Sequence, residues 1–163
     1  MLEIRETTRE DLKLVQSLWA DGNVMQYVGF PEGLKESDES MERWYRWIAE
    51  SRPRQNHYSI FESGVYCGET FYQIDGESHS AALDIKLFPH ARGRGIGTEA
   101  LRFAIREAFR NGAERAWVDP DPRNEKALAL YRRVGMMRKP TPPELYNPEY
   151  PNVLYFEITK TGE

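Results

Sequence analysis

The sequence lacks several features that would assign it to particular classes of protein. Its 163 residues contain no apolar run of about 18 residues, and the N-terminal segment 1–5 has no apolar core typical of signal peptides. A single cysteine, Cys67, excludes an internal disulfide, as is usual in a reducing compartment. We therefore expect a cytoplasmic protein with no membrane association.

Clustered positive charge is also missing. The formal net charge is −4, which argues against nucleic acid as a partner because phosphate backbones are bound through groups of Lys and Arg. The three histidines, His57, His79 and His90, are not spaced as metal ligands, so no metal is expected. A mildly acidic surface suits a cationic substrate, but acidity of this degree also serves solubility alone.

The apolar periodicity predicts one domain over residues 1–163. Turn signals at Ser63-Gly64 and Asp75-Gly76 separate stretches of period-two alternation, which predicts consecutive antiparallel strands. A later strand–helix–strand order requires a parallel crossover, so the sheet is mixed. The predicted strands cover 2–7, 57–62, 65–74, 80–88, 116–119 and 153–158; the predicted helices cover 8–22, 37–50, 99–111 and 124–134; the segments 23–37 and 138–152 are predicted loops.

Three glycines stand where the strand over 80–88 gives way to the next helix. They lie in the stretch Arg-Gly-Arg-Gly-Ile-Gly-Thr, residues 92–98. Glycine lets the backbone approach a ligand closely, and the N–H groups of a first helical turn attract an anion. Arg92 and Arg94 add positive charge, so the stretch predicts a phosphate-binding loop.

Spacing separates the loops that this stretch could form. A P-loop requires Lys after its last glycine, and none follows Gly97; a dinucleotide fingerprint counted from Gly93 requires Gly where Thr98 stands. The remaining pattern, Arg-x-x-Gly-x-Gly over 92–97, resembles the GNAT superfamily of acetyl-CoA-dependent N-acetyltransferases. Taken alone, the motif also fits a glycine-rich turn before an ordinary core helix.

A second motif points to the same family. Asn124-x-x-Ala127-x-x-x-Tyr131, followed by Gly135, resembles the GNAT pattern in which the Asn lies beside the pantetheine arm and the Tyr hydroxyl faces the thioester sulfur. Two motifs in the right order cover residues 81–135, and the remainder agrees by order of elements. The resemblance implies a GNAT-type α/β (α+β) fold, with a mostly antiparallel sheet of six to seven strands and about four helices.

One branch of the superfamily is more similar still. Residues 118–124, Val-Asp-Pro-Asp-Pro-Arg-Asn, resemble the Asp-Pro-x-Pro-x-Asn turn of aminoglycoside 6′-N-acetyltransferases. Those enzymes also carry an aspartate eight positions before the loop, where this chain has Asp84 ahead of Arg92. Met136 stands where the family tends to have an aromatic residue, which departs from the pattern.

The resemblance implies acetyl-CoA as the cosubstrate. In this family the strand before the loop bulges and splays from the next strand, so that its backbone pairs with the pantetheine amides and polarises the acetyl carbonyl. The pyrophosphate would lie on the N–H groups of residues 93–98. The implied binding residues are Ile85, Lys86, Leu87, Arg92, Gly93, Arg94, Gly95, Ile96, Gly97, Thr98, Asn124 and Ala127.

Acetyl transfer to an amine requires a base, because an alkyl ammonium has a pKa near 10. Alternation places Asp84 on the face opposite Leu83 and Ile85, and its carboxylate is the first candidate; its alternative is a solvated or ion-paired strand residue. Asp119 is the second candidate, with turn capping as its alternative. The resemblance implies that Tyr131 protonates the leaving thiolate, and core packing is its alternative.

We therefore expect direct transfer from acetyl-CoA to a primary amine in a ternary complex, since Cys67 is predicted to be a small buried side chain remote from the loop. Acids and aromatics in segments 32–39 and 144–150 fit a cationic small-molecule acceptor, and they fit a solvated surface almost as well. Two alternatives stay open: a protein N-terminal acetyltransferase of the ribosomal-protein-alanine type, and a non-catalytic CoA-binding regulatory module. The sequence holds no signal that decides for or against a homodimer.

Overall fold

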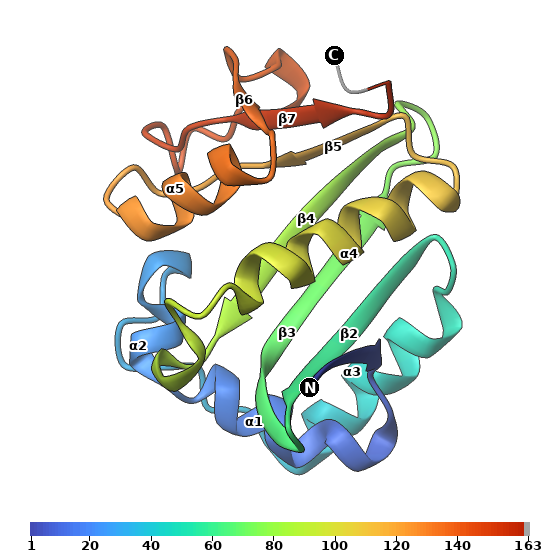
Figure 1. The fold of residues 1–163 in the computed structure, drawn as a ribbon, viewed down its shortest axis with the longest axis vertical. Helices are drawn as coiled ribbons and strands as arrows, with labels where there is room; N and C mark the ends of the chain where they lie inside the picture. Colours follow the sequence, from blue (N-terminus) through green and yellow to red (C-terminus); the bar gives the residue numbers. More distant parts are fainter. Residues whose placement is uncertain (162–163) are drawn as a thin grey trace.

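A computed structural model describes residues 1–161, which form a seven-stranded sheet with helices on both faces (Figure 1). Only β4 and β5 pair in parallel, and every other neighbouring pair is antiparallel. The predicted mixed, mostly antiparallel sheet is therefore confirmed. The strand order is β1 (Leu2–Glu6), β2 (Gln55–Glu62), β3 (Val65–Ile74), β4 (Ser80–Leu87), β5 (Arg115–Val118), β7 (Phe156–Thr159) and β6 (Met137–Arg138).

Helices cover the two faces of the sheet unequally. Figure 1 shows α4 and α5 on one face, while α1 and α3 lie on the other face, against the half formed by β1 to β3. No helix of the described part of the chain combines the length and the apolar composition that crossing a bilayer demands. The helices are α1 (Leu12–Trp19), α2 (Gly22–Met25), α3 (Asp38–Glu50), α4 (Ile96–Arg110) and α5 (Glu125–Arg133), with shorter helical turns at 9–11, 26–28, 89–91 and 143–145.

Alternating side chains of the central strands build two separate apolar layers. On the α4 face, Tyr58 and Tyr72 pack with Leu101 and with small residues such as Ala104, which let α4 approach the sheet closely. On the opposite face a smaller cluster joins α1 and α3 to the sheet; it contains Val15, Leu18, Met41 and Tyr66. Cys67 is buried in a third cluster beneath the glycine loop, as predicted for a small apolar side chain.

The bulge expected within residues 80–88 is not present. The register of β3 with β4 runs without a shift from Gly68 opposite Leu87 to Ile74 opposite Ala81. The shift lies instead in the β2–β3 pair, between Ile60 and Phe61, where β3 has one extra residue. Gly68 lies beside this extra residue, and a Cβ there would lie 1.9 Å from the carbonyl oxygen of Lys86 on β4, so only glycine fits.

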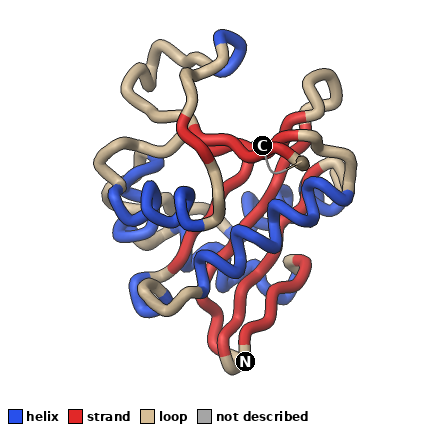
Figure 2. Tube along the Cα trace, turned by 45° about the horizontal axis from the view of Figure 1, so that its top comes forward, coloured by secondary structure: helices blue, strands red, loops and turns tan. Residues whose placement is uncertain are grey.

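Two further boundaries differ from the sequence-based prediction. Gly22 begins α2 rather than ending the first helix, because it packs so closely that a Cβ would lie 2.2 Å from the Pro31 carbonyl oxygen. Segment 138–152, predicted as a loop, follows directly from the two-residue strand β6, which is too short to show a period. The connection from β6 to β7 carries one helical turn and projects from the sheet (Figure 2).

A partly buried ion pair, with Asp11 buried and Arg5 partly exposed, connects the first strand to the first helical turn. The Arg5 guanidinium donates to both Asp11 carboxylate oxygens, at 2.8 and 3.1 Å, and the backbone N–H of Thr8 donates to the same carboxylate at 2.9 Å. Burial alone would raise the pKa of Asp11, but the bonds from Arg5, Thr8 and Ser59 outweigh it, so the pKa lies below 3.8.

Replacing Asp11 by Asn should lower the free energy of unfolding at pH 7 by about 1–3 kcal/mol, because Arg5 loses its charged partner. The folded-state pKa of Asp11 is depressed, so this stabilisation is present above about pH 4 and is lost as the pH falls through that pKa. Urea denaturation at pH 7 and pH 3 measures both effects. Asp38→Asn, which removes the well-exposed Lys13–Asp38 pair, should cost clearly less; equal losses would contradict this interpretation.

Candidate active site

The strands β4 and β5 run together for only three residues and then separate. Their last paired residues are Ala82 and Trp117. Beyond that pair β4 continues to Leu87, held by β3 on its other side, whereas β5 ends at Val118. Pro120 and Pro122 follow, and proline has no N–H to extend a strand ladder. The two strands therefore separate toward their C-terminal ends and leave an opening between them within the sheet.

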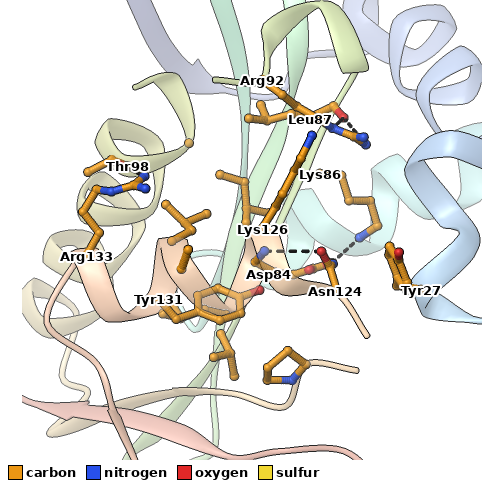
Figure 3. Close-up of a pocket in the computed structure, with 18 of the residues that line it drawn as sticks. Tyr27, Asp84, Lys86, Leu87, Arg92, Thr98, Asn124, Lys126, Tyr131 and Arg133 are labelled. Carbon is orange, nitrogen blue, oxygen red and sulfur yellow. Dashed lines mark hydrogen bonds and ion pairs between the residues drawn. The ribbon is translucent and has the colours of Figure 1, made fainter. Parts of the chain in front are cut away.

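A cavity of about 990 Å³ occupies this opening (Figure 3). Its walls come from β4, the glycine loop, α4, the turn after β5, α5 and the segment around α2. The structure thus brings together residues that are far apart in the sequence. Of the residues predicted for the site, the cavity is lined by Asp84, Ile85, Lys86, Leu87, Arg92, Gly93, Gly95, Gly97, Thr98, Asp119, Asn124, Ala127 and Tyr131.

The backbone of β4 presents polar groups to the cavity. The N–H of Phe88 donates to the Cys67 carbonyl at 2.9 Å, so the even-numbered residues of β4 exchange hydrogen bonds with β3. The backbone groups of Ile85 and Leu87 consequently face the opening. Arg92 donates to the Leu87 carbonyl at 3.0 Å and to the Asn23 carbonyl at 2.9 Å, which fixes the loop and the α2 segment to the end of β4.

The glycine loop leads into α4 without a side-chain cap. Gly95 is the N-cap residue and has the left-handed conformation, with φ of 80°. The first backbone N–H to donate along the helix is that of Glu99, which donates to the Gly95 carbonyl at 3.2 Å. The preceding N–H groups of the first turn face the cavity mouth, where the dipole of a 15-residue helix is positive. At α5, in contrast, the Asn124 side chain accepts from the Ala127 N–H at 3.3 Å.

Two predicted residues do not line the cavity with their side chains. Arg94 is exposed and donates to the His90 carbonyl at 3.4 Å, and Ile96 is buried beneath the loop with Cys67. Two basic residues that the sequence analysis did not identify, Lys126 and Arg133, do line it, and Arg133 donates to the Thr98 hydroxyl at 3.3 Å. Their spacing on α5 with Leu130, at i, i+4 and i+7, was the signal that could have found them.

Asp84 and Asp119 face each other across the opening. They are the next positions on the same face after the last pair, Ala82 and Trp117, because the parallel register advances both strands equally. Asp84 forms an ion pair with Lys86 (Figure 3). Lost solvation, followed by the charge of Asp84, raises the pKa of Asp119. Within residues 1–161, Asp119 has no ion pair, whereas the other carboxylates lining the cavity have one: Asp84 with Lys86, Asp121 with Arg123, and Glu99 with Arg102.

Tyr131 closes the inner end of the cavity. Its side chain is buried, and Figure 3 shows the ring extending from α5 toward Asp84. Burial, then the charges of Asp84 and Asp119, raise the pKa of its phenol well above the usual value. Tyr131 therefore stays protonated and can act as a hydrogen-bond donor at neutral pH. Within residues 1–161, no three His, Cys, Asp or Glu side chains group as metal ligands would.

Comparison with known proteins identifies this arrangement. The family model of the acetyltransferase (GNAT) domain matches residues 1–137. The chain belongs to the GNAT acetyltransferase family. It is accordingly an acyltransferase, as the two motifs predicted. Among curated protein sequences none matches the chain significantly.

Solved structures show the same fold at low identity. A spermidine N-acetyltransferase from Vibrio cholerae, in complex with CoA and spermine, has a TM-score of 0.83 and 21% identity over 99% of this chain and 96% of its own. A GNAT-family acetyltransferase from Streptococcus pneumoniae gives 0.80 and 21%, over 98% and 99%. An aminoglycoside acetyltransferase in complex with coenzyme A and kanamycin gives 0.77 and 16%, over 99% and 96%.

Replacing Gly95 by Ala should weaken CoA binding about tenfold, because a side chain in the left-handed region costs about 1–2 kcal/mol and the loop relaxes away from its present course. Gly112→Ala is the matched control. Gly112 also has a positive φ, at 109°, and a Cβ added there would meet no atom within 4 Å, but it follows the far end of α4. Calorimetric titration with CoA should separate the two variants; equal CoA affinity in both would contradict the loop's role.

Proposed function

We propose that this acetyltransferase transfers an acetyl group from acetyl-CoA directly to a primary amine of a cationic small molecule. The observation that carries the proposal is the pair Asp84 and Asp119, placed across the opening with the protonated Tyr131 beside them. Two carboxylates and a phenol that line one cavity can serve both proton transfers, the removal of a proton from the ammonium and the donation of a proton to the leaving thiolate.

The residues present fit a CoA-type ligand. The glycine loop and the uncapped first turn of α4 offer N–H groups to a pyrophosphate, and Arg133 and Lys126 add positive charge at the same wall. The backbone of Ile85 and Leu87 offers a strand edge to the pantetheine amides. When bound, acetyl-CoA would supply an activated acyl thioester. Asn124 is the N-cap residue of α5 and stabilises the start of this helix, which lies across the cavity from the backbone of Ile85 and Leu87.

The charge of the cavity favours a cationic acceptor. Asp84, Asp119 and the buried Glu69 behind them carry three potential negative charges; within residues 1–161 the cation paired with them is Lys86, joined by His57 when its imidazole is protonated. An ammonium entering here is attracted by the remaining negative charge. The spermine and kanamycin named in two of the similar structures are polycations of this type.

Asp119 is the better placed of the two aspartates to take the acceptor's proton. Its pKa is raised and it has no ion pair within residues 1–161, while Asp84 is held by Lys86. A base with a raised pKa accepts a proton more readily at neutral pH. We therefore assign the proton transfer to Asp119 and the attraction of the ammonium to Asp84, which reverses the order that the sequence alone suggested.

Protonation of Asp119 also prepares Tyr131. The charge of Asp119 is one cause of the raised phenol pKa, so neutralising it makes the Tyr131 proton easier to release. The phenol can then donate to the leaving thiolate at the moment when that charge develops. The ammonium thus loses one proton to Asp119, which passes it to solvent. After the attack, the sulfur gains a proton from Tyr131, and the second proton of the acylated nitrogen restores the phenol, so one proton is released for each acetyl group transferred.

Thiol release from acetyl-CoA with a panel of amines tests the proposed function. Spermine, spermidine and kanamycin should support release well above the rate of hydrolysis without amine. A peptide with an N-terminal alanine tests the protein N-terminal alternative, and release with that peptide alone would favour it. Binding of acetyl-CoA with no release on any amine would favour the regulatory module and contradict the proposal.

Replacing Tyr131 by Phe should lower kcat about 100-fold, because the leaving thiolate loses its proton donor. The dissociation constant for CoA should stay within about twofold, since the ring and its packing remain. Steady-state kinetics and CoA titration measure the two quantities separately. An unchanged kcat would remove Tyr131 from the mechanism and leave it as a core residue.

A further inference from the structure

A cluster of buried charges lies directly behind Asp84, on the sheet face opposite α4. The strand register creates it: Glu69 of β3 lies opposite Lys86 of β4, and Phe71 lies opposite Asp84. His57, on β2, is the partner of Phe71 on its other side. Glu69, Phe71 and His57 belong to none of the motifs that identify the family, yet they join the cavity to the core between the sheet and α1.

Glu69 is the fixed end of this cluster. Its side chain is 1% exposed, and one carboxylate oxygen accepts from the indole N–H of Trp19 at 2.7 Å. The other lies 3.7 Å from Nδ1 of His57. Burial would raise the pKa of Glu69, but the contact with His57, the charge of Lys86 and the bond from Trp19 outweigh it and lower the pKa to about 2. Glu69 is therefore a permanent buried anion.

Lys86 connects that anion to the cavity. Its ammonium lies 3.8 Å from Glu69, is bonded to Asp84, and stands 5.6 Å from the centroid of the Phe71 ring. Only 13% of its side chain is exposed. Burial would lower the pKa of Lys86, but Asp84 and Glu69 outweigh this and raise it. A long lysine side chain has many rotamers, and Glu69 and Phe71 restrict it to the one that reaches Asp84.

We propose that Lys86 is a positioning residue: held from behind by Glu69, it fixes the Asp84 carboxylate and offsets its charge, which leaves Asp119 to receive the acceptor's proton. This inference rests on the proposed function. It assigns to Lys86 a side-chain role in setting the balance between the two aspartates, in addition to any backbone contact with the cosubstrate.

The proton affinity of Asp119 depends on every charged or titratable group that faces Lys86 and the two aspartates. Phe71 and Trp19 are the uncharged members of the surrounding wall. The titratable and charged groups are Glu69 on β3, His57 on β2, Asp84 on β4, Lys126 and Tyr131 on α5, Asp119, Asp121 and Arg123 in the turn after β5, Tyr27 beside α2, and Arg92 in the glycine loop.

The sign of the effect follows from these charges. Lys86→Met removes the cation that offsets Asp84, so the Asp84 charge acts more strongly on Asp119 and the pKa of Asp119 rises further. Asp84→Asn removes the negative charge of Asp84 itself, so the pKa of Asp119 falls. In a plot of kcat/KM against pH, the acidic limb should move to higher pH in Lys86→Met and to lower pH in Asp84→Asn, each by about half a pH unit or more.

The decisive experiment combines that profile with carbon-13 NMR titration of the Asp119 carboxyl, which requires no turnover. Lys86→Met should raise the midpoint, and Lys86→Arg should restore it because the positive charge returns. Lys13→Met is the matched control: it removes a lysine from an exposed ion pair with Asp38 and should leave the midpoint unchanged.

An unchanged Asp119 midpoint in folded Lys86→Met, or an equal shift in Lys13→Met, would overturn the inference. If Lys86→Met does not fold, Lys86→Gln gives the same test: it keeps a polar side chain but removes the positive charge, so the Asp119 midpoint should rise, and no change would again overturn the inference. Failure of the wild-type protein to release thiol with any amine would contradict the proposed function alone, since the NMR titration still reports on Lys86.

Discussion

The separation of β4 from β5 is the constraint on which the site depends. Three paired residues bring the strands together, ending at Ala82 and Trp117. After that pair, β3 keeps β4 straight to Leu87, while the prolines at 120 and 122 stop β5. A sheet that remained closed here would bury both backbone edges in hydrogen bonds and would leave no space for a ligand between the strands.

Because the side chains of a strand alternate between the two faces of the sheet, the opening has apolar side chains on one face and acidic side chains on the other. Leu83 and Val118 point to the α4 side and join the main apolar core. Asp84 and Asp119 point to the other side, where helices cover only part of the sheet. An apolar arm and a cationic amine can therefore approach one point from opposite faces, with Tyr131 at their meeting place. The direct transfer that we propose requires this arrangement.

Much of this arrangement could be predicted from the sequence, because it follows from local rules. Alternation fixed the face of Asp84, and the spacing of residues 92–97 and 124–131 identified the loop and the helix that line the cavity. Other features depend on contacts between distant segments. The shift in register at Cys67 lies beside Gly68, which packs against Lys86 on the neighbouring strand, and no periodicity in either segment reveals this contact.

The roles that we propose for the two aspartates also rest on contacts between distant segments. Alternation along the strand favours Asp84 as the first candidate for the base, but the sequence does not show that Lys86, the partner of Asp84, also lies 3.8 Å from Glu69 on a neighbouring strand. The basic residues Lys126 and Arg133 were on the correct helix face, yet only the packing of α5 beside α4 shows that this face lines a cavity.

A crystal structure of the protein with CoA would show whether the cosubstrate occupies the opening between β4 and β5. We expect the pyrophosphate on the N–H groups at the start of α4, the pantetheine arm along Ile85 and Leu87, and the sulfur within hydrogen-bond distance of the Tyr131 hydroxyl. A CoA molecule bound outside the opening, or a sulfur remote from Tyr131 and from both aspartates, would contradict this expectation.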